Sequence, residues 1–184
     1  MATREQALAL LEEWVENPGL RNHMKAVEAA CRLYARKTGA DEELWGLTGL
    51  LHDLDWEKYP EEHPLRAVAA LRERGYPEPL LHAILAHRAD FTHVEPETQL
   101  DRTLLACDEL TGLINATALV RPNRLADMEP KSVKKKMKDP TFAAAVNRDE
   151  IRHGAELLGV ELDDHIRNVI EAMQGIAPEL GLAP

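Results

Sequence analysis

The sequence predicts an all-α protein made of a single-domain helical bundle. Apolar residues recur at helical spacing along most of the chain, and capping residues, proline or glycine bound these stretches. No sustained period-two run rich in β-branched residues occurs, and no Asn-Gly or Asp-Gly pair signals a hairpin. With 184 residues, of which 45% are hydrophobic, the chain is long enough to bury a core of its own.

Capping residues delimit the helices expected at the start of the chain. Thr3, with Gln6 three residues later, is a capping-box pattern, and the helix that it opens ends at Asn17-Pro18-Gly19. A second amphipathic helix runs from about Leu20 to Thr38, and Gly39 is its expected C-cap.

Three shorter helices are expected next. Asp41 can cap a third helix that runs through Leu51. Pro64 suits the first turn of a fourth helix over 65–74, because the N–H that proline lacks would have no partner there anyway. After a break that contains two prolines, a short helix runs from Leu80 to His87.

The second half of the chain is also predicted to be helical. Residues 98–120 form one long, largely apolar helix, and shorter elements fill 123–148. Asp149 and Asp163 are the expected N-caps of two final helices, which end near Leu180.

Charge and composition exclude several classes of protein. Thirty-two acidic and 22 basic residues give a formal net charge of −10, which argues against a broadly basic nucleic-acid binder. No stretch approaches the roughly 20 apolar residues that span a bilayer, and the N-terminus lacks the layout of a signal peptide. Cys31 and Cys107 form neither a CxxC pair nor a disulfide framework. We therefore expect a cytoplasmic protein that binds neither nucleic-acid polymers nor membranes.

Histidine and aspartate residues provide the main functional signal. His52 and Asp53 are adjacent at the end of an apolar helix, and imidazole with carboxylate suits divalent ions such as Mn, Fe, Co, Ni and Zn. His23 lies at the start of an earlier helix, and Asp108 interrupts a later apolar run, where a lone carboxylate is costly. The alternatives are a solvated His-Asp pair and a capped or salt-bridged core aspartate.

The ordered set His23, His52-Asp53 and Asp108 resembles the signature of the HD superfamily of metal-dependent phosphohydrolases. The stretch Leu-Leu-His-Asp-Leu-Asp at 50–55 is similar to the second motif of that family. The resemblance implies helices that bring the four side chains together around a divalent ion. We therefore expect residues 1–184 to form one domain. Its HD core covers about 20–120, and a C-terminal segment over about 121–184 packs on or covers the site.

The resemblance also suggests a second metal site. Some HD subfamilies carry two further histidines between the His-Asp pair and the last aspartate, and His63 and His87 occupy corresponding places. In those subfamilies the motif aspartate bridges two ions, a role that falls to Asp53 here. The alternatives are a polar residue at a helix start for His63 and a surface residue for His87. The sequence leaves open whether one ion or two ions bind.

Other polar residues are candidates for contacts with a substrate. Five lysines lie between residues 131 and 138, and Ser132 can cap a helix there. The lysines form either a solvated helix face or a positive lip, which means a basic rim of the pocket that holds phosphate. Lys134, Lys135 and Arg66 are the candidate phosphate contacts.

The leaving group of a phosphate ester requires a proton donor, for which His82 and Lys58 are the candidates. His82 is expected either behind the metal ligands or on the wall of the pocket. The remaining histidines at 93, 153 and 165 are expected to be exposed to solvent.

These residues together favour a metal-dependent phosphohydrolase. A metal with an open coordination position lowers the pKa of bound water, and the resulting metal-activated hydroxide can cleave a phosphomonoester or phosphodiester, such as that of a nucleotide. The expected partner is a small anionic, phosphate-containing substrate. Two alternatives stay open: an HD-type di-iron oxygenase, and a non-catalytic module that senses nucleotides. The oligomeric state also stays open, and a homo-oligomer is one possibility.

Overall fold

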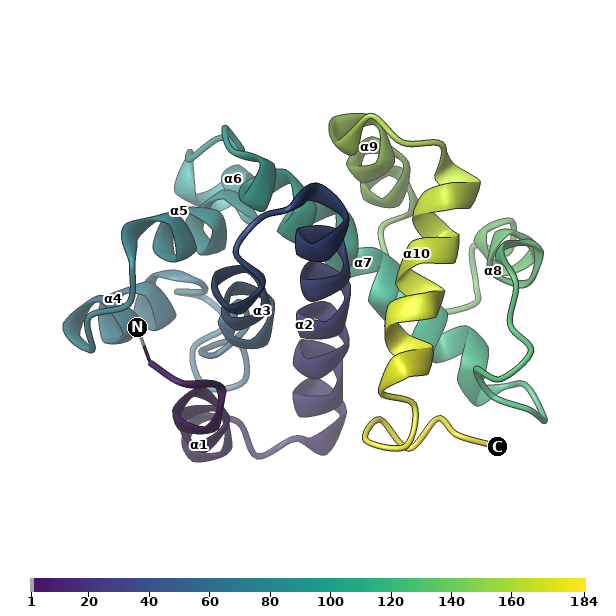
Figure 1. Ribbon diagram of the computed structural model, residues 1–184, viewed down its shortest axis with the longest axis horizontal. Coiled ribbons are helices and arrows are strands. Elements are labelled where there is room, and N and C mark those ends of the chain that lie inside the picture. The colour runs from purple at the N-terminus through teal and green to yellow at the C-terminus, as the bar shows by residue number, and fades with distance from the viewer. Residues whose placement is uncertain (1) are drawn as a thin grey trace.

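Ten α-helices make up the fold within residues 2–184, which are the residues that the computed structural model describes (Figure 1). Met1, with which the predicted domain begins, lies outside them. No strand occurs in the described range, so the predicted all-α fold class is confirmed. In chain order the helices are α1 (Arg4–Trp14), α2 (Pro18–Thr38), α3 (Glu42–Leu51), α4 (Leu65–Glu73), α5 (Glu78–Ala86), α6 (Ala89–Thr92), α7 (Gln99–Leu119), α8 (Pro130–Met137), α9 (Arg148–Leu158) and α10 (Leu162–Gly175).

Several of the predicted caps are formed. The side chain of Thr3 accepts a hydrogen bond from the backbone N–H of Gln6, and the side chain of Gln6 accepts one from the backbone N–H of Thr3. Gly39 ends α2 with a φ of 72°, a left-handed conformation that glycine adopts without steric cost. The Asp41 carboxylate accepts from the N–H of Leu44 and caps α3.

Two helices begin earlier than predicted. α2 starts at Pro18 rather than Leu20, because the side chain of Asn17 caps it and proline is well tolerated in a first turn. α5 starts at Glu78 rather than Leu80, and again a proline lies in the first turn.

The predicted caps of the last two helices are wrong. Asn147 caps α9 by accepting a hydrogen bond from the N–H of Asp149, which therefore lies inside the first turn. α10 follows Glu161, so Asp163 also lies in a first turn. Both aspartates still favour these helix starts, because the N-terminal end of a helix carries a partial positive charge.

Three further elements differ from the prediction. α10 ends at Gly175, before the expected end near Leu180. Ser132 lies inside α8 rather than at its cap, and its hydroxyl accepts a hydrogen bond from Arg121. Residues 89–92, for which no helix was predicted, form the short helix α6.

The central helix of the bundle is α2. The helices α3, α7 and α10 pack against it, while α5 and α9 pack against α7. Figure 1 shows α4, α5 and α6 on one side of α2, and α8, α9 and α10 on the other. Three helices that meet in the core position part of the candidate site: α2 carries His23, α7 carries Asp108, and α3 ends directly before His52 and Asp53.

Two glycines allow these helices to approach closely. A Cβ atom on Gly49 of α3 would lie 2.8 Å from the backbone of Val27 in α2. A Cβ atom on Gly154 of α9 would lie 2.6 Å from the Cα atom of Ala106 in α7. Both distances are shorter than carbon atoms tolerate, so larger residues would push the helices apart. Glycine at these positions therefore sets the spacing around the site.

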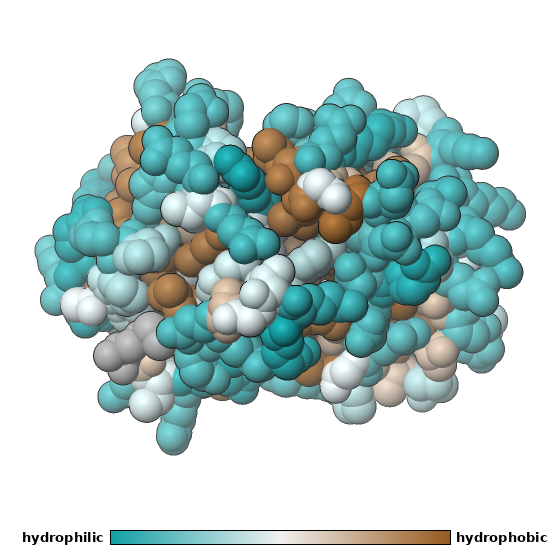
Figure 2. Space-filling view, turned by 45° about the horizontal axis from the view of Figure 1, so that its top comes forward, coloured by the Kyte–Doolittle hydropathy of each residue, from teal (hydrophilic) through white to brown (hydrophobic). Residues whose placement is uncertain are grey.

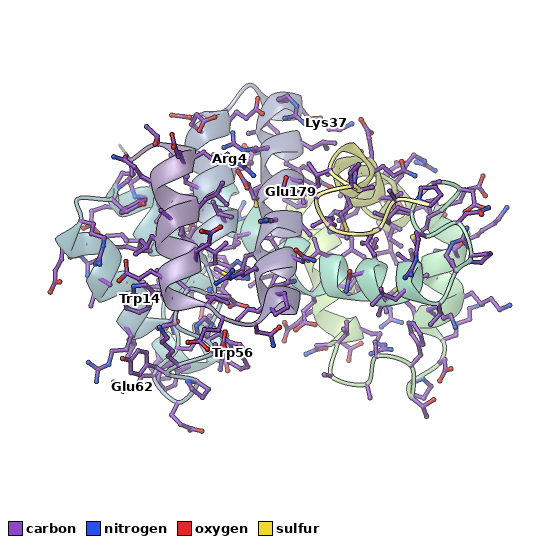
Figure 3. The ribbon with its side chains drawn as sticks, turned by 90° about the horizontal axis from the view of Figure 1, so that it is seen from below. Arg4, Trp14, Lys37, Trp56, Glu62 and Glu179 are labelled. Carbon is purple, nitrogen blue, oxygen red and sulfur yellow. The ribbon has the colours of Figure 1, made fainter. Side chains whose placement is uncertain are left out.

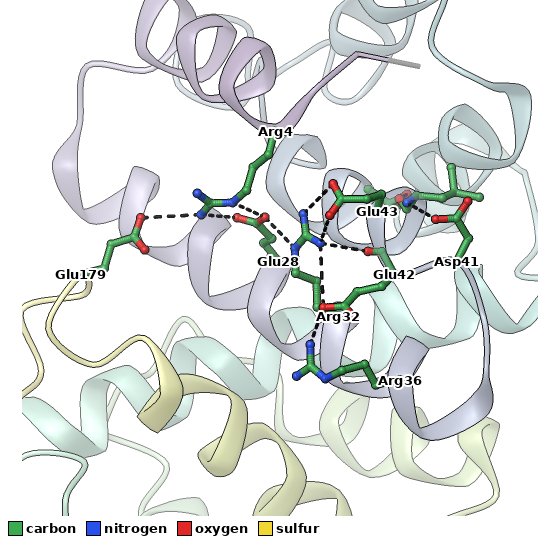
Figure 4. A network of polar contacts seen from close by, with 10 residues as sticks. Arg4, Glu28, Arg32, Arg36, Asp41, Glu42, Glu43 and Glu179 are labelled. Atoms are coloured by element: carbon green, nitrogen blue, oxygen red, sulfur yellow. Dashed lines mark hydrogen bonds and ion pairs between the residues drawn. The ribbon is translucent and has the colours of Figure 1, made fainter.

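A network of ion pairs joins α1, α2 and α3 (Figure 4). Glu28 is buried in α2, and its Oε1 atom lies 2.7 Å from Nε of Arg4 and 2.9 Å from Nε of Arg32. Arg32 in turn contacts Glu43 of α3 at 2.7 Å. A buried carboxylate is costly unless it is paired, so the network satisfies Glu28 and holds both neighbouring helices on α2.

Hydrophilic residues cover most of the face shown in Figure 2, and hydrophobic residues gather in patches near its middle. Among the helices of residues 2–184, none combines the length and the apolar character that a membrane crossing requires. Cys31 and Cys107 are free thiols in the core, and burial raises the pKa of Cys107 well above its usual value. A buried thiol with a raised pKa is a poor nucleophile.

The predicted exposure of His165 is wrong. Its ring is fully buried, where Nε2 donates a hydrogen bond to the carbonyl of Ala106 at 2.8 Å. Because Nε2 carries the proton, Nδ1 is an acceptor, and the hydroxyl of Tyr34 donates to it at 2.6 Å. His165 thereby joins α10 to α2 and α7, and burial lowers its pKa below 6.5.

This arrangement predicts a dependence of stability on pH. Below about pH 6.5 the unfolded chain gains a proton at His165 that the folded chain does not accept, so stability falls as the pH falls. Replacing His165 with Gln is expected to reduce the free energy of unfolding by about 1–3 kcal/mol at pH 7.5. The difference from the wild type should shrink at pH 5.5.

Urea unfolding of both proteins at the two pH values measures this effect, with the exposed His93→Asn variant as the control. A difference between wild type and His165→Gln that is equal at both pH values would contradict the prediction.

Candidate metal centre

The six predicted ligands come from five segments of the chain. His23 lies in the first turns of α2, and Asp108 lies in the middle of α7. His52 and Asp53 follow the last residue of α3, and His87 follows α5 in the same way. Adjacent residues within a helix point about 100° apart, so His52 and Asp53 could not both face one ion from the middle of a helix. Their position after the end of α3 removes this restriction.

One group of possible ligand atoms consists of His23, His52 and Asp108. The Oδ1 atom of Asp108 lies 2.9 Å from Nε2 of His23 and 3.4 Å from Nε2 of His52. These three ligand atoms all lie within 4.8 Å of one another. Two imidazoles and one carboxylate at such distances can surround a divalent ion.

A second group consists of Asp53, His63 and His87. The Oδ1 atom of Asp53 lies 3.3 Å from Nε2 of His63 and 3.7 Å from Nε2 of His87. The two histidine Nε2 atoms are 3.1 Å apart. Helix α5 places His87 at its end, and the turn before α4 places His63.

Asp53 connects the two groups. Its Oδ1 atom faces the second group, while its Oδ2 atom lies 3.5 Å from Nε2 of His52 and 3.8 Å from Nε2 of His23. Each carboxylate oxygen thus serves a different set of histidines. This is the arrangement that a bridging carboxylate requires, although ligation itself stays a prediction.

The ends of two helices orient two of the histidines. The Nδ1 atom of His52 donates to the carbonyl of Gly49 at 2.9 Å, and Nδ1 of His87 donates to the carbonyl of Ile84 at 2.5 Å. Both carbonyls belong to the last helical turn, where backbone oxygens lack partners within the helix. Because carbonyls only accept, both histidines carry a proton on Nδ1, and Nε2 is the ring nitrogen that can bind a metal ion in the site.

The other two histidines are oriented by side chains. The Nδ1 atom of His63 lies 2.7 Å from Oδ1 of the buried Asp55, and a carboxylate only accepts. The hydroxyl of Thr111 donates to the backbone of α7, so it accepts from Nδ1 of His23 at 3.3 Å. All four histidines therefore direct Nε2 inward, which is the role that outer partners have around metal ligands.

The donor atoms of the site fit a cation. With the protons of His63 and His87 on Nδ1, their Nε2 atoms lie 3.1 Å apart and each points a lone pair at the other. Two lone pairs at this distance repel each other unless a positive charge lies between them. The Nε2 atom of His52 is fully buried and has no hydrogen-bond partner among residues 2–184. A buried polar atom without a partner is costly. Divalent ions bound in the two groups would satisfy all three atoms.

The electrostatics of the site also favour a cation. Burial alone would lower the pKa of His52, but the carboxylates of Asp53 and Asp108 outweigh it and raise that pKa to about 10. Burial would conversely raise the pKa of both carboxyls, yet His52 holds them well below their usual range. The two carboxylates are therefore ionised and attract positive charge into the core.

Asp55 has a structural role that sequence reasoning missed. Besides orienting His63, its Oδ2 atom accepts a hydrogen bond from the backbone N–H of Ala67 at 2.8 Å. It thereby ties the second group to the first turn of α4. The only signal for this role was its place in the motif at 50–55, two residues after Asp53.

A cavity of about 720 Å³ opens onto the ligand groups. Its wall includes Trp56, whose side chain is 43% exposed and lies edge-on to His63 with ring centroids 5.1 Å apart. Figure 3 shows Trp56 with Trp14 and Glu62 on the side of the molecule opposite Lys37. This volume is sufficient for an organic molecule larger than a phosphate ion.

The C-terminal segment completes the cavity. Ala145, Val146, Glu150 and His153, in α9 and the residues before it, line the cavity together with Asp108. Glu109 of α7 accepts a hydrogen bond from the backbone N–H of Asn147, and burial raises its pKa to about 7. His153 is exposed as predicted, but its place on the cavity wall was not foreseen.

The predicted proton donors do not line this cavity. The Nζ atom of Lys58 donates to the carbonyl of Glu13 at 3.1 Å. His82 lies one and a half turns before His87 in α5, where its Nδ1 atom is 3.0 Å from Oδ2 of Asp101. Both placements correct the prediction, because the packing of α5 and the turn after α3 directs these side chains toward other segments.

The predicted phosphate contacts also lie elsewhere. Arg66 is exposed and pairs with Glu62 one turn earlier at 2.8 Å. Lys134 pairs with Asp163 of α10 at 2.7 Å, because α8 packs beside α10, and Lys135 is exposed. None of the three is among the residues that line the cavity, which corrects the predicted positive lip.

Comparison with known proteins identifies a family for this arrangement. The family model described as HD domain matches residues 20–113. This range covers all six residues of the two ligand groups, and it amounts to just over half of the chain. No curated protein and no solved structure matched the chain.

Proposed function

The chain belongs to the HD-domain family, and from this premise we propose that it is a phosphohydrolase that cleaves a phosphomonoester or phosphodiester of a nucleotide. Membership places the chain in a superfamily of metal-dependent phosphohydrolases. The observation that carries the proposal is the pair of donor groups joined by Asp53 at the base of a cavity. Divalent ions held by these residues would lower the pKa of bound water and neutralise phosphate oxygens.

The protein's own residues prepare the site for that chemistry. Four inward-facing Nε2 atoms and two ionised carboxylates form a donor set whose orientation is held before substrate arrives. Asp53, whose two carboxylate oxygens face different histidines, would hold ions bound in the two groups close together. In this proposal residues 20–120 provide the ligands, and the C-terminal segment from about 121 covers one side of the site.

The wall of the cavity supports a nucleotide as the substrate. The exposed ring of Trp56 offers a flat surface on which a base can stack, beside the candidate ligand His63. The proposed partner is therefore a small phosphate-containing molecule. The acidic surface of the protein, with a net charge of −10, disfavours a nucleic-acid polymer.

The first experiment combines metal analysis with activity assays. Protein purified without added metal is analysed for bound metals, and it is then assayed with Mn or Ni on p-nitrophenyl phosphate, bis-p-nitrophenyl phosphate and nucleoside monophosphates. We expect one or two ions per chain and hydrolysis that a chelator abolishes. Hydrolysis that persists in excess chelator, or tight nucleotide binding without turnover under every metal condition, would overturn the proposal.

The same donor set favours one second candidate. Four imidazoles and two carboxylates also suit two irons, which would make the protein an oxygenase rather than a hydrolase. Two irons in the purified protein, together with oxygen uptake in the absence of phosphate release, would support this alternative over the phosphohydrolase.

A further inference from the structure

The cavity wall carries a net negative charge beyond the ligand groups. Four lining residues outside those groups are carboxylates: Asp90, Glu95, Glu109 and Glu150. Against them, Arg88 is the only lysine or arginine among the described residues that line the cavity. The wall thus offers one permanent positive charge to an anionic substrate.

Arg88 is well placed to receive a phosphate group. It follows the candidate ligand His87 directly, and about a third of its side chain is exposed. Its guanidinium binds Asp90 through two parallel contacts, Nε to Oδ1 at 3.0 Å and Nη2 to Oδ2 at 3.1 Å. A phosphate group presents the same pair of acceptor oxygens, and a displaced Asp90, which is mostly exposed, would be solvated by water.

We propose that the cavity selects substrates with a single phosphate group, which Arg88 binds, and discriminates against substrates with a second phosphate. This inference rests on the proposed function, since the two ligand groups serve the phosphate that reacts. A second phosphate elsewhere in the cavity would lie near Glu95 or Glu150 without a cationic side chain to balance it. Like charges brought together in a partly enclosed site cost binding energy.

A pair of nucleotides tests this selectivity in the metal-loaded, full-length protein. The hydrolysis of a nucleoside 5′-monophosphate is compared with that of the 3′,5′-bisphosphate at equal free Mn. The separated phosphates of the bisphosphate chelate metal less than a triphosphate does. We expect kcat/KM to be at least about tenfold higher for the monophosphate.

Matched variants link the selectivity to the cavity wall. Glu95→Lys adds a positive charge at the wall and is expected to reduce the preference for the monophosphate severalfold. Glu97→Lys makes the same change two residues away, on an exposed side chain outside the lining, and should leave the preference unchanged. Because neither glutamate side chain forms a hydrogen bond or ion pair among residues 2–184, both variants should fold.

Variants of Arg88 test its direct contact with phosphate. Arg88→Gln is expected to raise KM for the monophosphate by about tenfold or more at unchanged metal content, and Arg88→Lys should recover part of the loss because it retains the charge. Equal kcat/KM for both nucleotides, or equal effects of Glu95→Lys and Glu97→Lys, would overturn the inference while leaving the hydrolase intact. If no phosphate ester is hydrolysed at all, p-nitrophenyl phosphate included, the proposed function fails and the inference fails with it.

Discussion

Replacing Asp53 with alanine is expected to abolish hydrolysis and to reduce metal binding at both ligand groups. Among residues 2–184, Asp53 is the one residue whose two carboxylate oxygens face different sets of histidines. Without Asp53, the buried Nε2 atoms of the histidines lose the carboxylate that they share. A bound metal ion then lacks the negative charge that would balance its own. Since outer partners of metal ligands alone contribute about 10–100-fold, the loss in kcat/KM should exceed about a hundredfold.

Metal analysis and phosphatase assays on the same preparation measure this effect. Asp163→Ala is a matched control, because it removes an exposed aspartate of α10 that pairs with Lys134 and does not line the cavity. Circular dichroism shows whether each variant remains folded. An Asp53→Ala protein that keeps full metal occupancy and activity would show that the bridging position has been assigned to the wrong residue.

Replacing Asp55 with asparagine is expected to affect the second ligand group selectively. The two oxygens of Asp55 accept from Nδ1 of His63 and from the N–H of Ala67, and an asparagine amide would direct an NH₂ group at one of these donors. His63 then loses its orientation, whereas His23, His52 and Asp108 keep their partners. We expect affinity for the second ion to fall by about 10–100-fold, with the first ion retained.

A titration of the metal-free protein separates the two groups by their stoichiometry. Asp101→Asn provides the control, because Asp101 is another fully buried carboxylate that accepts backbone N–H groups, at the start of α7. Both variants should lose some thermal stability, but only Asp55→Asn should change the titration. Equal weakening of both ions in Asp55→Asn, or identical titrations in the two variants, would contradict the prediction.

The candidate site was partly predictable because its pattern is local. An adjacent His-Asp pair at the end of an apolar helix signals ligands without any knowledge of the fold, and helix periodicity placed Asp108 on a core-facing stretch. The structure brings both together with His23, His63 and His87 in two groups. Asp55, by contrast, was visible in the motif but had no assignable partner, because Ala67 and His63 approach it only after α4 packs.

The basic residues show the limit of sequence reasoning most clearly. Charge density favoured the lysines around Lys134, yet the packing of α8 beside α10 turns that residue toward Asp163. A single arginine, Arg88, lies on the cavity wall instead, and no local pattern distinguished it. His165 was expected in solvent because its helix is amphipathic, but Tyr34 and Ala106 enclose it.

The sequence alone determined the all-helical fold, most of the helices and the kind of ligand chemistry. These features depend on residues a few positions apart, such as the Thr3 and Gln6 capping box or the His52-Asp53 pair. Only the tertiary structure decided which oxygen of Asp53 faces which histidines, which cation faces the cavity and which histidine is buried. Such contacts depend on the spacing and the angle between helices that are distant in the sequence. Close approaches such as that at Gly49 set this geometry, and no short stretch of sequence specifies it.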